Sequence, residues 1–278
     1  VIMWEKLGEV VSSWILSPVA GAVIAFLVFR SIVHFVFASG KPAEAAKKFG
    51  PIFIGMTFFI ITLSLFTKTR LGNMLFTGMD QVMLLSLAVF AVSSVAGVFI
   101  VGKMTIGTGY EAVEYLFRKL QIITSCYVAL SHGANDVANA IAPLSVVLTT
   151  ALDSTSIVTG NFSYYLLALG GAGIAAGILT WGYKVIRTLG SKITALTNTR
   201  GFSVDFGTAT TVLVASRLGL PISTSHTVVG AVIGVGLAKG LEAVDLSIVK
   251  KIIYSWALTL PVAITLSIVI YKGLMIVF

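Results

Sequence analysis

The chain has 278 residues, of which 57% are hydrophobic and 11% are charged. Soluble domains carry about 25% charged residues, so a water-soluble fold of this length is excluded. The mean hydropathy is +1.00, which suits a bilayer, where a spanning helix needs about 20 apolar residues. The net charge is +8, but the basic residues lie in short segments between apolar runs, as membrane insertion favours. We therefore expect no nucleic-acid partner.

Apolar segments long enough to form transmembrane helices recur along the chain. They cover residues 14–37, 51–66, 81–102, 120–152, 162–183 and 252–278. Two shorter apolar pieces, 202–218 and 222–238, are joined by a Gly-Leu-Pro sequence and are predicted to form a re-entrant helical hairpin. The sequence thus predicts an all-α, polytopic membrane protein.

Two polar segments interrupt the first half of this pattern. Residues 38–50 carry three lysines and are predicted to form a loop. An amphipathic stretch follows residue 103, and its Glu111 and Glu114 alternate with basic neighbours. Both glutamates are predicted to lie on a solvated helix face.

A short repeat links the two ends of the chain. SWILSPVA begins at Ser13 and SWALTLPVA begins at Ser255, and each opens a long apolar helix. The first copy is interpreted as the tail of a repeat whose head would precede Val1. The predicted organisation is a tail helix of the first repeat at 1–40, connecting transmembrane helices at 41–102, and a second repeat at 103–278.

Basic residues predict the orientation of the spans. The segment 184–200 carries two lysines and two arginines and is predicted to be cytoplasmic, whereas 153–161 carries none and is predicted to lie outside. Alternation along the chain then makes the helices near Trp14 and Trp256 cross the cell membrane in opposite directions, with the C-terminus outside. Opposed repeats are the inverted-repeat architecture of many secondary transporters.

The first polar constellation in an apolar segment is SHGANDVANA, residues 131–140. Asp136 is the only formal charge of its span, and an ionised carboxylate there costs several kcal/mol unless it is paired, hydrated or bound to an ion. Asn135 and Asn139 share a helix face, and carboxylate and amide oxygens suit a small hard cation. Gly133 is expected to let the helix break. The alternative is a polar cluster that only joins helices.

The second constellation is GLPISTSH, in which Gly219 and Pro221 predict a turn. Ser223 is predicted to be the N-cap of a new helix, followed by Thr224 and Ser225. Unpaired N–H groups, the helix dipole and three hydroxyls together favour an anion. The alternative is a capped turn in an ordinary loop.

Three further polar residues accompany these motifs. His132 and His226 are interpreted as hydrogen-bonded structural residues, with proton relay as the alternative. Asp205 is predicted to cap the N-terminus of the first hairpin helix, with a ligand role as the alternative.

GANDVANA at 133–140 and PISTSH at 221–226 resemble the paired signatures of the inorganic phosphate transporter family, which includes sodium-coupled phosphate carriers. The two SW…P helices and GFSVDFGTAT at 201–210 resemble it as well, so the likeness covers essentially the whole chain. The family implies an inverted-repeat transporter with two copies of each motif and with sodium or protons as coupling ions. Because this sequence has one copy of each, a missing N-terminal half is expected before Val1. A homodimer that supplies its own second half is the alternative.

The resemblance implies a secondary active transporter, not an enzyme, that imports inorganic phosphate with sodium by alternating access. Sodium is expected at Asn135, Asp136 and Asn139, and no other cofactor is expected. Phosphate is expected at Ser223, Thr224 and Ser225, with Asp136 across a shared sodium. The alternatives are a proton-coupled phosphate or sulfate permease and, more distantly, an intramembrane hydrolase that uses Ser225, His226 and Asp136.

Overall fold

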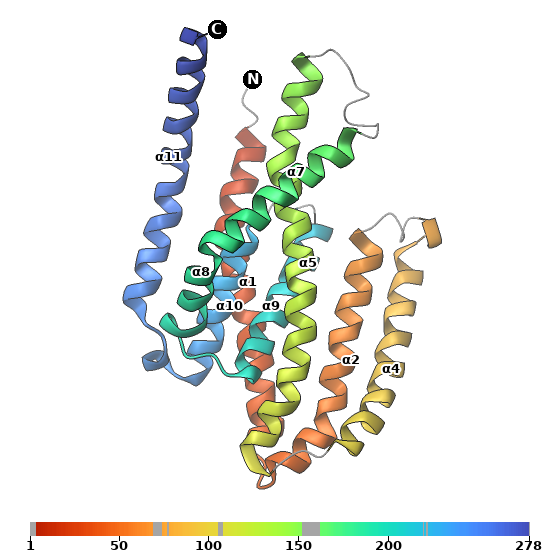
Figure 1. The fold of residues 1–278 in the computed structure, drawn as a ribbon. Helices are drawn as coiled ribbons and strands as arrows, with labels where there is room; N and C mark the ends of the chain where they lie inside the picture. Colours follow the sequence, from red (N-terminus) through yellow and green to blue (C-terminus); the bar gives the residue numbers. More distant parts are fainter. Residues whose placement is uncertain are drawn as a thin grey trace.

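The computed structural model describes residues 4–68, 74–76, 78–104, 108–151, 162–218, 220 and 222–277 (Figure 1). Its elements are helical, and no strand occurs among these residues. Five helical stretches are long and apolar enough to cross a membrane: 8–37, 42–67, 79–103, 162–192 and 246–276. The all-α, polytopic class is confirmed, while the inverted repeat stays a prediction.

The first two helices are separated by a much shorter turn than predicted. Helix α1 (Trp4–Ile32) ends in a π-helical turn, Val33–Phe37, and α2 (Pro42–Lys68) begins only five residues later. The prediction of a loop over 38–50 is therefore wrong beyond residue 41. Proline suits the first position of a helix, and the alanine, glutamate and lysine residues that follow favour helix strongly.

Helix α4 (Met79–Lys103) packs along α2. Helix α5 (Gly109–Ala151) has 43 residues and unites the amphipathic stretch with the apolar segment predicted at 120–152. At 1.5 Å per residue it is roughly 65 Å long, about twice the 30 Å hydrocarbon core. Helix α5 is not among the five stretches that are apolar enough to span, so the apolar span predicted at 120–152 is not borne out.

The next helical stretch also runs further than predicted. Helix α7 (Phe162–Gly177) continues through a π-helical turn into α8 (Tyr183–Arg187), and a second π-helical turn ends at Lys192. The basic segment after residue 183 is thus partly helical. The segment 153–161, predicted to lie outside the cell, falls outside the described residues.

The predicted hairpin is formed by α9 (Asn198–Arg217) and α10 (Thr224–Lys239). Figure 1 shows both helices entering from one end of the bundle and meeting partway along α5. Helix α1 packs against both of them. Its backbone comes so close that a methyl group added to Gly230 would overlap Pro18, and one added to Gly207 would lie 2.8 Å from Ala25. Small residues permit this approach between membrane helices.

Aromatic rings fix α5 against the hairpin. Phe53 of α2, Phe117 of α5 and Phe202 of α9 are buried together, with ring centroids 5.3–6.1 Å apart. Because protein interiors are closely packed, these rings set the distance between the three helices. The portion of α5 that carries Asp136 is thereby placed beside the hairpin tip.

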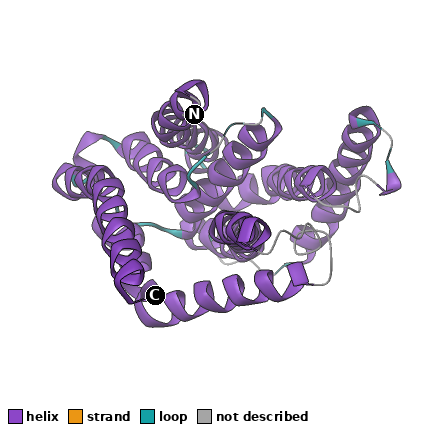
Figure 2. Cartoon of the chain, turned by 90° about the horizontal axis from the view of Figure 1, so that it is seen from above, coloured by secondary structure: helices purple, strands orange, loops and turns teal. Residues whose placement is uncertain are grey.

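The last helix, α11 (Leu246–Val277), begins at an exposed cap. Asp245 accepts hydrogen bonds from the Ser247 hydroxyl at 2.6 Å and from two backbone N–H groups, and the Ser247 hydroxyl is the main reason why the pKa of Asp245 is below its usual value. Figure 1 shows α11 running in the opposite direction to α1, as the inverted repeat requires. Figure 2 places its C-terminal end at the edge of the bundle.

Candidate functional site

The hairpin tip carries the predicted helix start. Helix α10 begins at Thr224, and the Ser223 hydroxyl accepts a hydrogen bond from the His226 backbone N–H at 3.3 Å. The predicted N-cap at Ser223 is confirmed. The turn residues Gly219 and Pro221 lie outside the described residues. Other N–H groups of this first turn have no partner within the helix and are directed toward the tip.

Asp136 lies beside this helix start, half-buried within α5. The Thr224 hydroxyl donates to Asp136 Oδ1 at 3.3 Å, and the Asn135 side-chain amide donates to the same oxygen at 3.3 Å. His132 Nε2 lies 2.6 Å from the other oxygen, Oδ2. The carboxylate is thus compensated by three neighbours, as a partly buried charge requires. Helix α5 is unbroken through Gly133, so the expected break is wrong.

The remaining predicted site residues lie close to Asp136 in different ways. Asn139 is exposed one turn further along α5, and it takes no part in the hydrogen bonds described around Asp136. Ser225 lines a cavity of about 470 Å³ together with His132 and Trp256. The structure therefore brings Asn135 and Thr224 into direct contact with Asp136. Ser225 lines the same cavity as His132, the partner of Asp136.

The same cavity is lined by a lysine for which the sequence predicted only a role in membrane topology. Lys184 of α8 lines the wall that contains His132 and Ser225. Its Nζ lies 5.9 Å from the centre of the Tyr183 ring. The two lysines and two arginines of residues 184–200 gave no indication that Lys184 would line this cavity. Its position depends on α7 and α8, which cross the bundle obliquely (Figure 1).

His226 connects the two helices of the SW repeat. Its ring stacks on Trp256 of α11 with centroids 3.8 Å apart, and it hydrogen-bonds the backbone of Trp14 in α1. This is the structural role predicted for it. Asp136, in contrast, is paired with His132, so Ser225, His226 and Asp136 do not form the hydrogen-bonded series of a hydrolase triad.

A second carboxylate lies deeper in the same region. Asp205 sits two turns inside α9 and accepts hydrogen bonds from Ser125 and, at 3.2 Å, from Thr124, both on α5. The predicted capping role is wrong because α9 begins at Asn198. Asp205 is the only acidic residue between 198 and 239, and that isolation was the signal of a buried role.

The cap of α9 is supplied by another helix. Glu114 of α5 accepts hydrogen bonds from the Thr199 backbone N–H at 3.1 Å and from the Thr199 hydroxyl at 2.7 Å. The prediction that Glu114 lies on a solvated face is wrong, whereas Glu111 is exposed as predicted. A carboxylate at a helix N-terminus is stabilised by the dipole, so Glu114 holds the base of the hairpin on α5.

One buried hydroxyl near Asp136 has no partner among the described residues. Thr208 of α9 is 2% exposed, and its Oγ1 makes no hydrogen bond. It lines a small space of about 10 Å³ together with Thr224 and His132. Such a space holds roughly one water molecule or one small ion, and an unpaired buried hydroxyl favours an occupant that can bind its oxygen.

Comparisons with known proteins identify the family of this chain. The model of the phosphate transporter family matches residues 1–267. The chain belongs to the phosphate transporter family. A protein of Pyrococcus abyssi described as a phosphate permease is 48% identical over all of this chain and 68% of its own length. Inorganic phosphate transporter 2-1, chloroplastic, of Arabidopsis thaliana is 38% identical over 96% of this chain and 50% of its own length.

A solved structure titled the sodium-dependent phosphate transporter is 43% identical and superimposes with a TM-score of 0.77. The match covers 93% of this chain and 64% of that one, so the chain spans just under two thirds of the solved protein. The resemblance to the phosphate transporter family is confirmed. Its members are carriers and not enzymes, so the hydrolase alternative is wrong.

Proposed function

We propose that this chain provides the phosphate and sodium sites of a secondary active transporter, which imports inorganic phosphate across the cell membrane by alternating access. The observation that carries the proposal is the contact between Thr224, at the start of α10, and Asp136 on α5. It joins an anion-binding helix terminus to a carboxylate at membrane depth. Membership of the phosphate transporter family supports phosphate as the anion.

Phosphate binds at the N-terminus of α10 in this proposal. The hydroxyls of Thr224 and Ser225 and the unpaired backbone N–H groups supply donors, and Ser223 holds the turn in place through its cap. Lys184 adds positive charge from the cavity wall. Backbone donors and a nearby cation compensate an oxyanion that has lost its hydration shell.

Sodium binds between Asp136 and phosphate. Asn135 uses its amide N–H₂ on Asp136, which leaves its carbonyl oxygen available as a ligand. Asn139 contributes from the next turn, and the unpaired hydroxyl of Thr208 adds a neutral oxygen. A cation here removes the repulsion between carboxylate and phosphate, which is severe in a low dielectric. Each ion then strengthens binding of the other, which is the thermodynamic basis of coupling.

One observation favours a second candidate, proton-coupled phosphate uptake. His132 Nε2 lies 2.6 Å from Asp136 Oδ2, so the pair is arranged to share a proton. Histidine is the side chain whose ordinary pKa lies closest to neutrality. In this alternative a proton on the His132–Asp136 pair replaces sodium as the coupling ion.

The test is uptake of radiolabelled phosphate into liposomes that contain the full-length protein. Sodium coupling requires uptake that follows an inward sodium gradient and persists in His132→Gln. Uptake that follows a pH gradient, ignores sodium and is lost in His132→Gln would establish the proton-coupled alternative. An excess of unlabelled sulfate should leave phosphate uptake unchanged, and strong inhibition by sulfate would overturn the choice of phosphate.

A further inference from the structure

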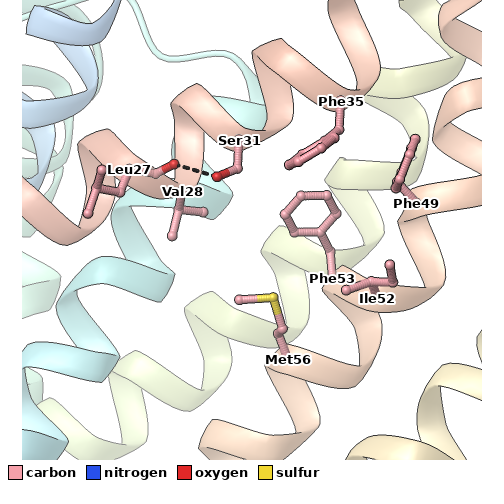
Figure 3. Close-up of a pocket in the computed structure, with 8 residues that line it drawn as sticks. All are labelled: Leu27, Val28, Ser31, Phe35, Phe49, Ile52, Phe53 and Met56. Atoms are coloured by element: carbon pink, nitrogen blue, oxygen red, sulfur yellow. Dashed lines mark hydrogen bonds between the residues drawn. The ribbon is translucent and has the colours of Figure 1, made fainter.

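An apolar groove lies between α1 and α2, away from the ion site. Its volume is about 400 Å³, and Phe53 and Met56 form its floor on α2 (Figure 3). Ser31 is the one polar side chain of the lining, and its hydroxyl donates to the Leu27 backbone carbonyl at 2.8 Å. That hydroxyl is therefore satisfied within α1. The groove therefore presents an almost entirely apolar surface to any molecule that occupies it.

The groove opens toward the outside of the bundle. Leu27, Phe35 and Ile52 line it, and they are 57%, 48% and 45% exposed. All three lie within stretches that are long and apolar enough to span a membrane. The opening is therefore apolar enough to face the acyl region of a bilayer.

A basic pocket adjoins one end of the groove. Its volume is about 410 Å³, and it shares Phe35 and Phe49 with the groove, so this aromatic pair forms the boundary between the two. The ring centroids of the pair are 5.3 Å apart. Lys41 and Lys48 line the pocket beyond them.

The charges of this pocket are only partly compensated. Lys41 Nζ lies 3.1 Å from Glu44 Oε1, and both side chains are exposed. Lys48 Nζ lies 5.5 Å from the centre of the Phe49 ring. Two lysines against one glutamate leave a net positive charge at the end of an apolar groove, which is the charge distribution that an anionic lipid complements.

We propose that the groove and the pocket together bind one anionic phospholipid of the surrounding bilayer. One acyl chain lies along Leu27, Ile52 and Met56, and the headgroup phosphate contacts Lys41 and Lys48. Neither half of the site suffices alone, because a free anion gains nothing from the groove and a lipid without net charge is attracted much less by the lysines than an anionic one. The proposal is independent of the ion site, which lies on α5 and α10.

The experiment is native mass spectrometry of the full-length protein, purified from vesicles of phosphatidylglycerol and phosphatidylcholine with identical acyl chains. Wild type should retain the anionic lipid about tenfold more than the neutral one, because two lysines attract the headgroup. The double variant Lys41→Gln/Lys48→Gln should retain the two lipids equally. Glu44→Gln should retain more anionic lipid than wild type, because it removes the competing carboxylate.

The groove is tested separately from the charge. Ile52→Trp fills the opening from an exposed position and should lower retention of both lipids, and Leu27→Trp does so from α1 if the first variant fails to insert. Lys103→Gln, an exposed lysine outside the groove, should behave as wild type. The proposal is overturned by equal retention of both lipids in wild type, or by loss in Lys103→Gln equal to that of the double variant. If filling the groove leaves retention of the anionic lipid unchanged, the lysines alone hold the headgroup and the proposal is overturned. The same conclusion follows if the wild type carries inorganic phosphate adducts that the double variant lacks.

Discussion

The Thr224 hydroxyl donates to Asp136 Oδ1 at 3.3 Å, although 88 residues separate the two side chains in sequence. This contact places the start of the hairpin helix α10 directly on the carboxylate of α5. Any movement of the hairpin relative to α5 must therefore alter the environment of this carboxylate. A transporter that couples two ions needs a link of this kind between their sites.

Replacing Asp136 by Asn should abolish sodium-driven phosphate uptake while the protein still inserts. An interaction with a charged group contributes about 1.5–3 kcal/mol, so sodium affinity should fall about 10- to 100-fold. Uptake against sodium concentration measures the effect. Asp245→Asn, at an exposed helix cap, is the matched control and should transport normally. Wild-type uptake by Asp136→Asn would refute the assigned role.

Thr224→Val removes the hydroxyl but keeps the branched shape of the side chain. Phosphate affinity should fall about tenfold, because the variant loses the single O–H that donates to Asp136 in this structure and that would turn to donate to a bound anion. Thr224→Ser keeps the hydroxyl and should retain most of the affinity. Equal losses in the two variants would mean that the methyl group, which is buried with the rest of Thr224, matters as much as the hydroxyl, and would contradict a specific role of the hydrogen bond.

Glu114→Gln should lower the thermal stability of the protein in detergent, because it removes the charge that caps α9. Loss of a helix cap costs about 1 kcal/mol. The matched control is Glu111→Gln, an exposed residue one turn earlier on the same helix. Differential scanning fluorimetry compares the two, and an equal shift in melting temperature would show that Glu114 acts only through net charge.

Gly230→Leu should separate α10 from α1 and reduce the yield of folded protein, because the added side chain meets the backbone at Pro18. Gly173→Leu adds the same bulk on α7, where no atom lies within 4 Å of the added carbon. Size-exclusion profiles in detergent compare the variants. A monodisperse Gly230→Leu protein with wild-type stability would contradict the close approach of these helices.

Cysteines introduced at positions 6 and 250 should be labelled from opposite sides of the membrane. The first lies at the start of α1 and the second near the start of α11, and the two helices run in opposite directions. The background is Cys126→Ala, because Cys126 is exposed. We expect position 6 to react from outside and position 250 from inside. Labelling of both from one side would rule out the predicted inverted repeat and the outside C-terminus.

The membrane environment of this protein and the start of the helix α10 could be predicted from the sequence. Apolar runs of about 20 residues have no stable alternative to a membrane, and Ser223 before Thr224 starts a helix because a serine side chain satisfies a local N–H group. Both effects depend on residues that are close together in the chain, so both can be recognised from the sequence. For the same reason the pattern identified Asn135, Asp136, Thr224 and Ser225 as chemically unusual.

The contacts between these residues, in contrast, depend on how the helices pack. Glu111 and Glu114 have the same chemistry and lie three positions apart, yet only Glu114 reaches Thr199, because the packing of α9 on α5 selects one face. The partners of Asp205 and the entry of Lys184 into the cavity beside His132 depend on the same packing. Such contacts join residues 50 or more positions apart, and they follow from how helices fit together in three dimensions, which no local propensity encodes.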